Sequence, residues 1–290
     1  MATRRLVLPA ETPADVARGS IFFVGTATVL IRYAGFTLLT DPNFLHRGQH
    51  VRLGYGLRSR RLTDPALAIE QLPPVDAVLL SHLHEDHFDR VAEERLPRSL
   101  PVVTTPHAAD SLSRKGFFAT QALATWETFE CVKGDARLRI TATPGRHGPR
   151  LVCRLLPPVM GALLEFERGT GEHLLRIYIT GDTLVTAALR EIPARYPDID
   201  VALLHLGGTR ILGILVTMDA RQGIEILRLT SPRAAIPIHY NDYTVFRSPL
   251  GDFARAAQEA GLADRVRYLT HGQTYDFDVP ESRRALRRPA

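Results

Sequence analysis

Apolar residues recur along this chain in short runs bounded by turn residues, and these runs predict most of its strands. In SIFFVGTATVLIRYAGFTLLTDP (20–42), three β-branched runs are separated by GTAT and AG, which predicts a β-meander. The run at 162–180 has a glycine-rich centre and predicts a hairpin. Further strands are predicted at 75–81, 101–105, 127–132, 136–143, 201–206, 234–240 and 265–270.

Between these runs, four segments predict helices, at 86–96, 107–116, 219–229 and 253–261. Asp219 is placed to cap the third helix and Gly116 to close the second. Because strands alternate with helices, the sequence predicts an α/β fold with mixed sheets.

The two halves of the chain also echo each other. FTLLTDP and RIYITGDT each end a strand at an aspartate, Asp41 and Asp182, and DAVLLSHLH is echoed by DVALLHLGG. The echo predicts two similar layers that face each other, with their strand ends meeting at one edge. No linker separates the halves, so we expect one domain over 1–290, with a core at about 20–275, an N-terminal leader and an arginine-rich C-terminal tail.

Composition narrows the class of protein. The 290 residues contain no run of 18 apolar residues, so no membrane span is expected. The first residues lack the apolar stretch of a signal peptide, which predicts a cytoplasmic location. Cys131 and Cys153 lie outside any CxxC pair and are expected to be reduced thiols. The net charge is +5, but the cations are nearly all arginine and are spread along the chain, which argues against a nucleic-acid partner. The sequence does not determine the oligomeric state, so assembly into a homo-oligomer is left open.

Candidate chemistry is concentrated in SHLHEDHFD (81–89). In an extended loop, alternate side chains point the same way, so His82 and His84 can aim at one point. Asp86 and His87 can aim at a second point close by. Imidazoles and carboxylates are ligands for zinc, manganese or iron, so the loop predicts part of a metal site.

Such a site needs further ligands from elsewhere in the chain. His147 in TPGRHGP, Asp182 in YITGDT and His239 in IPIHY each follow an apolar run. Loop residues held at the end of a rigid strand are suited to this role.

HLHEDH, followed in order by these three residues, resembles the metallo-β-lactamase superfamily motif HxHxDH…H…D…H over about residues 20–275. The resemblance implies an αββα sandwich of two mixed β-sheets flanked by helices, with two divalent metal ions, zinc first and manganese or iron as alternatives. It implies one metal on His82, His84 and His147, a second on Asp86, His87 and His239, and Asp182 as a bridge. GTATVLI…FTLLTDP and LPPVMGALLEF further resemble the branch that contains ascorbate-6-phosphate lactonase and N-acylphosphatidylethanolamine phospholipase D.

Two positions within the motif favour hydrolysis. His84 stands where diiron oxygen-reducing members carry Glu, and Asp182 stands where several true β-lactamases carry Cys. Two metals about 3.5–4 Å apart can share a water and lower its pKa from 15.7 towards roughly 7. By the resemblance, Asp86 also carries a proton to the leaving group. We therefore expect hydrolysis of a small-molecule ester, lactone or phosphodiester, and the positive net charge favours an anionic one.

Outside the motif, three residues have a functional and a structural interpretation. Asp41 either accepts a hydrogen bond from a ligand histidine or opens a turn before Pro42. Tyr240 and Tyr243 either donate a hydrogen bond to substrate or pack within the fold.

Arginines in HRGQHVRLGYGLRSRRL (46–62), above all Arg58, Arg60 and Arg61, either hold the charged group of a substrate or belong to a solvated loop. The run ILGILV (211–216) either lines an acyl pocket or touches lipid, or it packs on the domain. His205 is expected to be structural or to line the pocket. No ligand role is expected for the histidines His107, His173 and His271.

Two other function classes remain open. A nuclease of the same fold would usually carry an added nucleic-acid-binding arm, and the sequence shows no such segment. A non-catalytic metal-binding protein would be favoured by the loss of a ligand, but all seven positions are filled.

Overall fold

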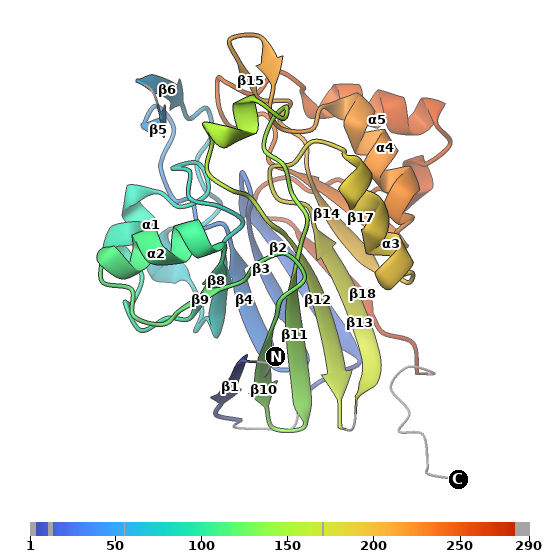
Figure 1. Cartoon of the computed structure of the whole chain (residues 1–290). Helices are drawn as coiled ribbons and strands as arrows, with labels where there is room; N and C mark the ends of the chain where they lie inside the picture. Colours follow the sequence, from blue (N-terminus) through green and yellow to red (C-terminus); the bar gives the residue numbers. More distant parts are fainter. Residues whose placement is uncertain (1–3, 11–13, 55, 170, 282–290) are drawn as a thin grey trace.

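Two mixed β-sheets form the centre of the protein in the computed structural model, which describes residues 4–10, 14–54, 56–169 and 171–281 (Figure 1). The first sheet contains β2 (Arg18–Gly25), β3 (Thr28–Tyr33), β4 (Phe36–Thr40), β7 (Ala77–Leu79), β8 (Val102–Thr104), β9 (Thr120–Ala122) and β18 (Thr274–Asp278). The second contains β1 (Arg4–Leu8), β10 (Thr128–Lys133), β11 (Ala136–Thr143), β12 (Gly161–Arg168), β13 (Glu172–Ile179), β14 (Val201–His205) and β17 (Ala234–Ile238). Two hairpins lie outside these sheets, β5 (His50–Gly54) with β6 (Leu57–Arg60), and β15 (Arg210–Ile211) with β16 (Ile214–Leu215).

Both sheets combine an antiparallel meander with a block of parallel strands. In the first sheet, β2, β3 and β4 are antiparallel neighbours, and β4, β7, β8 and β9 pair in parallel. In the second, β10 to β13 are antiparallel, and β13, β14 and β17 pair in parallel. Because parallel strands end at the same edge of a sheet, this arrangement gathers the residues that follow β4, β7, β13, β14 and β17.

Helices cover the outer faces of both sheets (Figure 1). On the first sheet lie α1 (Arg90–Arg95) and α2 (Pro106–Arg114); on the second lie α3 (Glu191–Arg195), α4 (Ala220–Thr230) and α5 (Leu250–Glu259). Short 3-10 turns occur at η1 (Ile69–Gln71), η2 (Val152–Arg154), η3 (Ala187–Arg190) and η4 (Ala263–Arg265). Between the sheets, buried side chains such as Phe23, Phe36, Leu138, Phe166 and Ile177 form one core. The predicted αββα sandwich of two mixed sheets is thus confirmed.

The first predicted helix begins later than expected, at Arg90 instead of residue 86. The backbone N–H groups of His87 and Phe88 donate to the carbonyl of His84, which closes a tight turn. The Asp89 carboxylate then caps α1 at the Ala92 N–H, 2.8 Å away. The motif residues therefore lie on a loop rather than on a helix.

The predicted strand at 265–270 is wrong. After η4, the chain makes one isolated bridge from Val266 to Ala235 of β17 and then leaves the sheet. The last strand is β18, which pairs with β2 instead. At the other end of the chain, β1 lies within the predicted leader and pairs in parallel with β10. The arginine-rich tail, with Arg283, Arg284, Arg287 and Arg288, lies outside the described residues.

Candidate metal centre

All seven predicted metal-binding side chains lie at the edge where the parallel strands of both sheets end. The first sheet supplies the HLHEDH loop after β7. The second supplies the other three, His147 after β11, Asp182 after β13 and His239 after β17. Because each ligand position follows a buried strand, the sheets determine where these side chains meet.

Three imidazoles converge on one point. Ligand atoms of His82, His84 and His147 all lie within 4.8 Å of one another. The Nε2 atom of His82 lies 2.9 Å from the Nδ1 atom of His84. Nδ1 of His147 lies 3.0 Å from the Val216 carbonyl, so it is the donor nitrogen, and Nε2 remains for a ligand.

A second convergent group joins Asp86, His87 and His239, with ligand atoms again within 4.8 Å of one another. Nε2 of His239 lies 3.6 Å from Oδ2 of Asp86. Asp182 connects this group to the first: its Oδ1 lies 3.4 Å from Nδ1 of His239, and the residue also groups with His82 and His87. Its carboxylate therefore stands between the two groups.

Several atoms of this cluster are buried without a hydrogen-bond partner. They are Oδ1 of Asp86, Nε2 of His87, Oδ1 of Asp182 and both ring nitrogens of His239. A buried polar atom left unpaired costs roughly 1–3 kcal/mol. Their convergence on a buried centre lined with anionic and imidazole donors fits divalent cations.

The protonation states of His84 and Asp86 suit metal binding. Burial and the neighbouring His147 imidazole lower the pKa of His84 to about 3. Burial opposes the charged form of Asp86, but the attraction of His87 and His239 outweighs it and lowers the pKa of Asp86 to about 2. Neutral imidazoles and charged carboxylates are the forms that bind metals. Burial opposes the charged form of His87, but Asp182, Asp41 and Asp86 outweigh it and raise the pKa of His87 well above its usual value, so this imidazole must lose a proton before it can bind a cation.

His239 is held in a backbone conformation that is unusual for a non-glycine residue, with φ of 59°. Its N–H donates to the carbonyl of Thr26, which itself has φ of 53°. The Thr26 N–H donates to Oδ2 of Asp242 at 2.8 Å, and that carboxylate also accepts from the Thr63 hydroxyl. Asp242 thus supports the turn that supports His239.

Asp41 lies beneath the cluster rather than in a solvent-exposed turn. Its Oδ1 accepts the Ser81 N–H at 2.7 Å. Its Oδ2 lies 3.3 Å from Nδ1 of His87 and 3.4 Å from Nε2 of His205. This geometry supports the interpretation in which Asp41 orients a ligand histidine. His205 itself is fully buried, and its Nδ1 lies 3.1 Å from the Thr180 hydroxyl.

Two contacts to the cluster come from a segment to which sequence reasoning gave no such role. Thr217 donates its hydroxyl to Oδ2 of Asp182 at 2.8 Å, and Val216 provides the carbonyl that faces His147. Val216 is the last residue of the apolar run at 211–216, and Thr217 follows it directly. In the sequence, the only indication of this role is that a polar residue, Thr217, directly follows the apolar run.

The two tyrosines pack within the fold. The Tyr240 hydroxyl donates to the carbonyl of Leu269 at 2.8 Å, and the Tyr243 hydroxyl donates to Oδ1 of Asn43 at 3.0 Å. Both side chains are buried. These hydroxyls are therefore engaged inside the protein, and the substrate-donor interpretation loses its support.

The arginines predicted to hold substrate fall into two environments. Arg61 is fully buried: its Nε donates to the Thr63 carbonyl, and its guanidinium lies 5.6 Å from the centre of the Tyr243 ring. Arg58 and Arg60 are exposed on β6. Arg61 forms an isolated bridge with Tyr243, far along the chain, and a contact of this kind leaves no local signal in the sequence.

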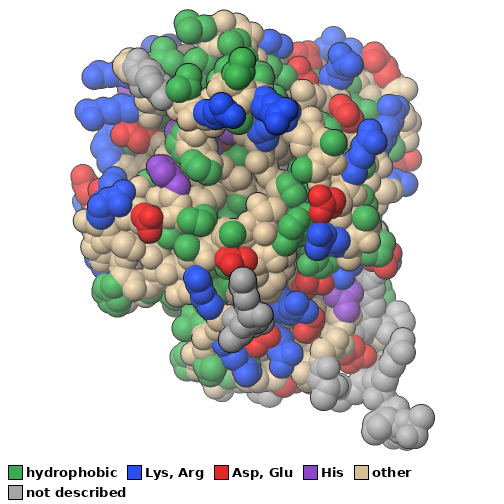
Figure 2. Space-filling view, viewed as in Figure 1, with side chains coloured by type: hydrophobic (Ala, Val, Ile, Leu, Met, Phe, Trp, Pro, Cys, Tyr) green, Lys and Arg blue, Asp and Glu red, His purple; other side chains and the backbone are tan. Residues whose placement is uncertain are grey.

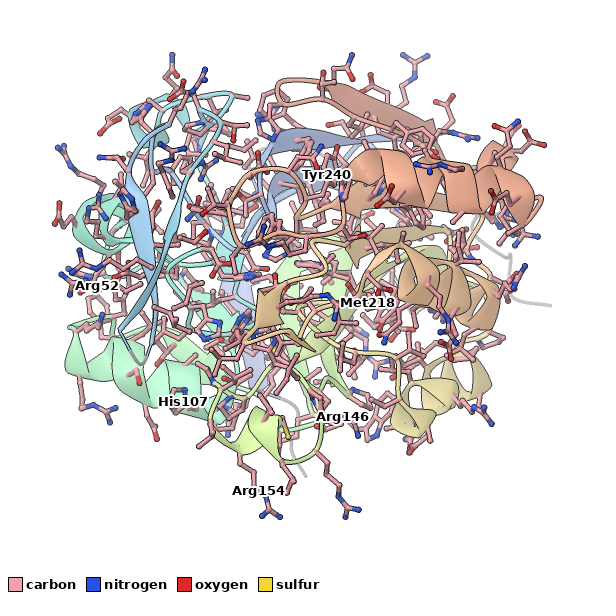
Figure 3. All side chains as sticks on the ribbon, turned by 90° about the horizontal axis from the view of Figure 1, so that it is seen from above. Arg52, His107, Arg146, Arg154, Met218 and Tyr240 are labelled. Atoms are coloured by element: carbon pink, nitrogen blue, oxygen red, sulfur yellow. The ribbon has the colours of Figure 1, made fainter. Side chains whose placement is uncertain are left out.

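The same hairpin instead contributes Arg52, which is labelled in Figure 3, to a pocket of about 380 Å³ that reaches His84. Its other charged lining residues are Glu85, Arg90, Glu93 and Lys115, and its apolar walls are Leu53, Leu83, Phe88, Leu155, Leu156 and Pro157. Neither Arg58 nor Arg60 lines it.

The remaining histidines lie apart from the described metal-ligand groups. His107 is exposed on α2 (Figure 3), His173 lies on β13, and His271 faces Asp242 at 3.2 Å. Cys131 and Cys153 are both free thiols, and burial raises the pKa of Cys131 to about 12.

Comparison with known proteins places this geometry in context. The family model described as beta-lactamase superfamily domain matches residues 37–240. The UPF0173 protein YddR of Bacillus subtilis is 26% identical over 266 residues, with 88% of this chain and 98% of that protein covered. The UPF0173 metal-dependent hydrolase NEQ378 of Nanoarchaeum equitans is 27% identical over 209 residues, with 71% and 87% covered. In its fold, the chain is similar to an isothiocyanate hydrolase from Delia radicum gut bacteria, with a TM-score of 0.76, 23% identity, and 89% and 99% covered.

Proposed function

The chain belongs to the beta-lactamase superfamily, and from this premise we propose that it is a metal-dependent hydrolase with two divalent metal ions, zinc, manganese or iron. The observation that carries the proposal is the buried convergence of seven imidazole and carboxylate side chains with unpaired ligand atoms. Relatives named as metal-dependent hydrolases are consistent with it.

In this proposal, His82, His84 and His147 would hold one ion, Asp86, His87 and His239 would hold the other, and Asp182 would contribute to both sites. The ions would supply an activated water and stabilise the charge that develops during hydrolysis. Of the chain's own groups, Asp41 and the Val216 carbonyl fix the orientation of His87 and His147.

Asp86 is the proposed proton carrier for the leaving group. One of its oxygens faces His239, while Oδ1 is buried without a hydrogen-bond partner. A carboxylate of this kind can hold a cation through one oxygen and exchange a proton through the other.

The pocket beside His84 favours a small anionic ester, lactone or phosphodiester. Arg52, Arg90 and Lys115 line it with positive charge, partly balanced by Glu85 and Glu93. Leu83, Phe88 and Leu156 offer apolar walls to the remainder of the substrate. The lipid phosphodiester of the branch that the sequence resembles has this mixed character, and the phosphate-bearing lactone of that branch shares its negative charge.

One substrate screen tests the proposal. The purified protein is assayed with and without chelator on a phosphorylated lactone, bis-p-nitrophenyl phosphate, a carboxylic ester, an isothiocyanate and a short RNA. The isothiocyanate is included because of the structural relative's name. Chelator-sensitive turnover of an ester, lactone or phosphodiester supports the proposal, and turnover of RNA alone favours the nuclease. No turnover by metal-loaded protein favours a non-catalytic metal-binding protein.

A further inference from the structure

Four of the nine large apolar side chains that are exposed in the described part of the chain lie on two turns next to the candidate metal centre. In the described part of the chain, Leu212 is 92% exposed, Leu151 79%, Leu155 61% and Ile214 41%. Single exposed leucines are ordinary on protein surfaces, but adjoining ones indicate a binding surface.

The two turns lie against each other. The carbonyl of Val216, at the end of the β15–β16 hairpin, accepts a hydrogen bond from Nδ1 of His147. His147 directly precedes the turn that contains η2. A Cβ atom at Gly148 would lie 3.2 Å from the Val216 side chain and 3.5 Å from that of Val152. The hairpin and η2 both lie at the top of Figure 1. Figure 2 shows hydrophobic side chains gathered at this end of the molecule, with arginine or lysine beside them.

Both turns carry arginines and no acidic residue. Arg150 and Arg154 are exposed in RHGPRLVCRLL (146–156), and Arg210 is 44% exposed in TRILGILV (209–216). Neither stretch contains Asp or Glu. The carboxylate of Asp219 lies 3.9 Å from the guanidinium of Arg210. Figure 3 shows the Arg154 side chain extending outward from the protein.

Projecting aliphatic side chains surrounded by arginines are typical of segments that lie in the interface of an anionic bilayer. The aliphatic tips enter the acyl boundary, and the guanidinium groups pair with lipid phosphates through two parallel hydrogen bonds. A stable protein interface buries about 800 Å² per partner and is rich in aromatic residues. Two narrow turns that expose leucine and isoleucine suit a lipid surface better.

We propose that these turns form a membrane-docking rim, made of Leu151, Leu155, Leu212, Ile214, Arg150, Arg154 and Arg210, that binds the surface of an anionic phospholipid bilayer. Because His147 and Val216 tie the rim to the metal centre, docking would turn the site towards the lipid surface. Binding at the rim requires no metal and no turnover, so it stands or falls independently of the proposed hydrolase activity.

Vesicle sedimentation of the full chain tests the rim. Vesicles of phosphatidylcholine alone are compared with vesicles of phosphatidylcholine and phosphatidylglycerol in equal parts. We expect binding to the anionic vesicles that weakens as salt is added. A Leu151→Ser/Leu212→Ser variant is expected to lose affinity by about tenfold or more. An Arg150→Gln/Arg154→Gln variant is expected to lose about fivefold for each arginine.

The matched control is a Val7→Ser/Phe118→Ser variant. These two residues are 71% and 76% exposed, and they lie outside the two turns. It is expected to bind like the unaltered protein, and circular dichroism establishes that each variant is folded. Absence of binding to anionic vesicles overturns the proposal, as does an equal loss in the control and in the leucine variant. A concentration-dependent dimer that the leucine variant abolishes, without vesicle binding, would assign the rim to a second copy of the chain and overturn it too.

Discussion

Nε2 of His87 lies 3.5 Å from Oδ1 of Asp182, although the two residues follow strands of different sheets. His87 follows β7 in the first sheet and Asp182 follows β13 in the second. The candidate metal centre is therefore completed only where the two sheets meet at their strand ends.

Metal removal is expected to lower stability. Without cations, the buried atoms of Asp86, Asp182 and His239 lack partners, whereas bound ions at about 100 times their Kd would add about 2.7 kcal/mol. Metal analysis should give about two ions per chain. A chelated sample with an unchanged melting temperature would contradict the assignment.

Asp182→Asn should abolish most hydrolysis. An amide cannot neutralise two cations, so kcat/KM is expected to fall by more than the roughly 10–100-fold that is typical of groups outside the ligand set. Asp135→Asn, on a carboxylate that is 48% exposed, is the control and should leave activity unchanged. Equal activity in the two variants would remove Asp182 from the site.

Asp41→Asn should have an intermediate effect. One oxygen becomes an NH₂ group that faces Nδ1 of His87, so a donor meets a donor. Metal affinity or activity is expected to fall roughly 10–100-fold, with a smaller loss for His205→Ala. The measurement is metal titration of both variants, and an unaltered titration of Asp41→Asn would leave this residue with a turn-forming role only.

Asp242 should contribute stability that depends on pH. Burial opposes its charge, but the His271 and Thr63 hydrogen bonds outweigh burial and lower the pKa of Asp242 below 3.8. A carboxylate whose pKa is lower in the folded state stabilises that state at pH values above its unfolded-state pKa. This contribution is lost as the pH falls through the folded-state pKa. Asp242→Asn in metal-depleted protein should therefore cost about 2 kcal/mol at neutral pH and progressively less below about pH 4. Urea unfolding at several pH values measures it, and a cost independent of pH would be the contrary result.

Arg52→Gln should discriminate between substrates. It is expected to lower kcat/KM for an anionic ester about tenfold and to leave a neutral ester nearly unchanged. Arg60→Gln, on the same hairpin but outside the pocket, is the matched control. Parallel losses on both esters would mean that Arg52 shapes the hairpin rather than holds charge.

The strand-end positions of the candidate ligands were predictable because they are local: apolar runs end within three residues before His82, Asp182 and His239. The environment of Arg61 was not predictable, because its burial depends on Tyr243 from a distant segment. The start of α1 was missed for a similar reason, since Asp89 also accepts the N–H of Phe44 at 2.5 Å. Long-range pairing of this kind leaves no periodic pattern in the sequence.

The division of ligand positions between the two sheets bears on how the protein matures. A growing chain finishes most of the first sheet, with the HLHEDH loop, well before His239 leaves the ribosome. Until the second sheet docks, only four of the seven donors are in place, and an incomplete set binds cations weakly. Metal binding therefore stabilises only fully assembled molecules, and truncated or half-assembled chains remain susceptible to proteolysis.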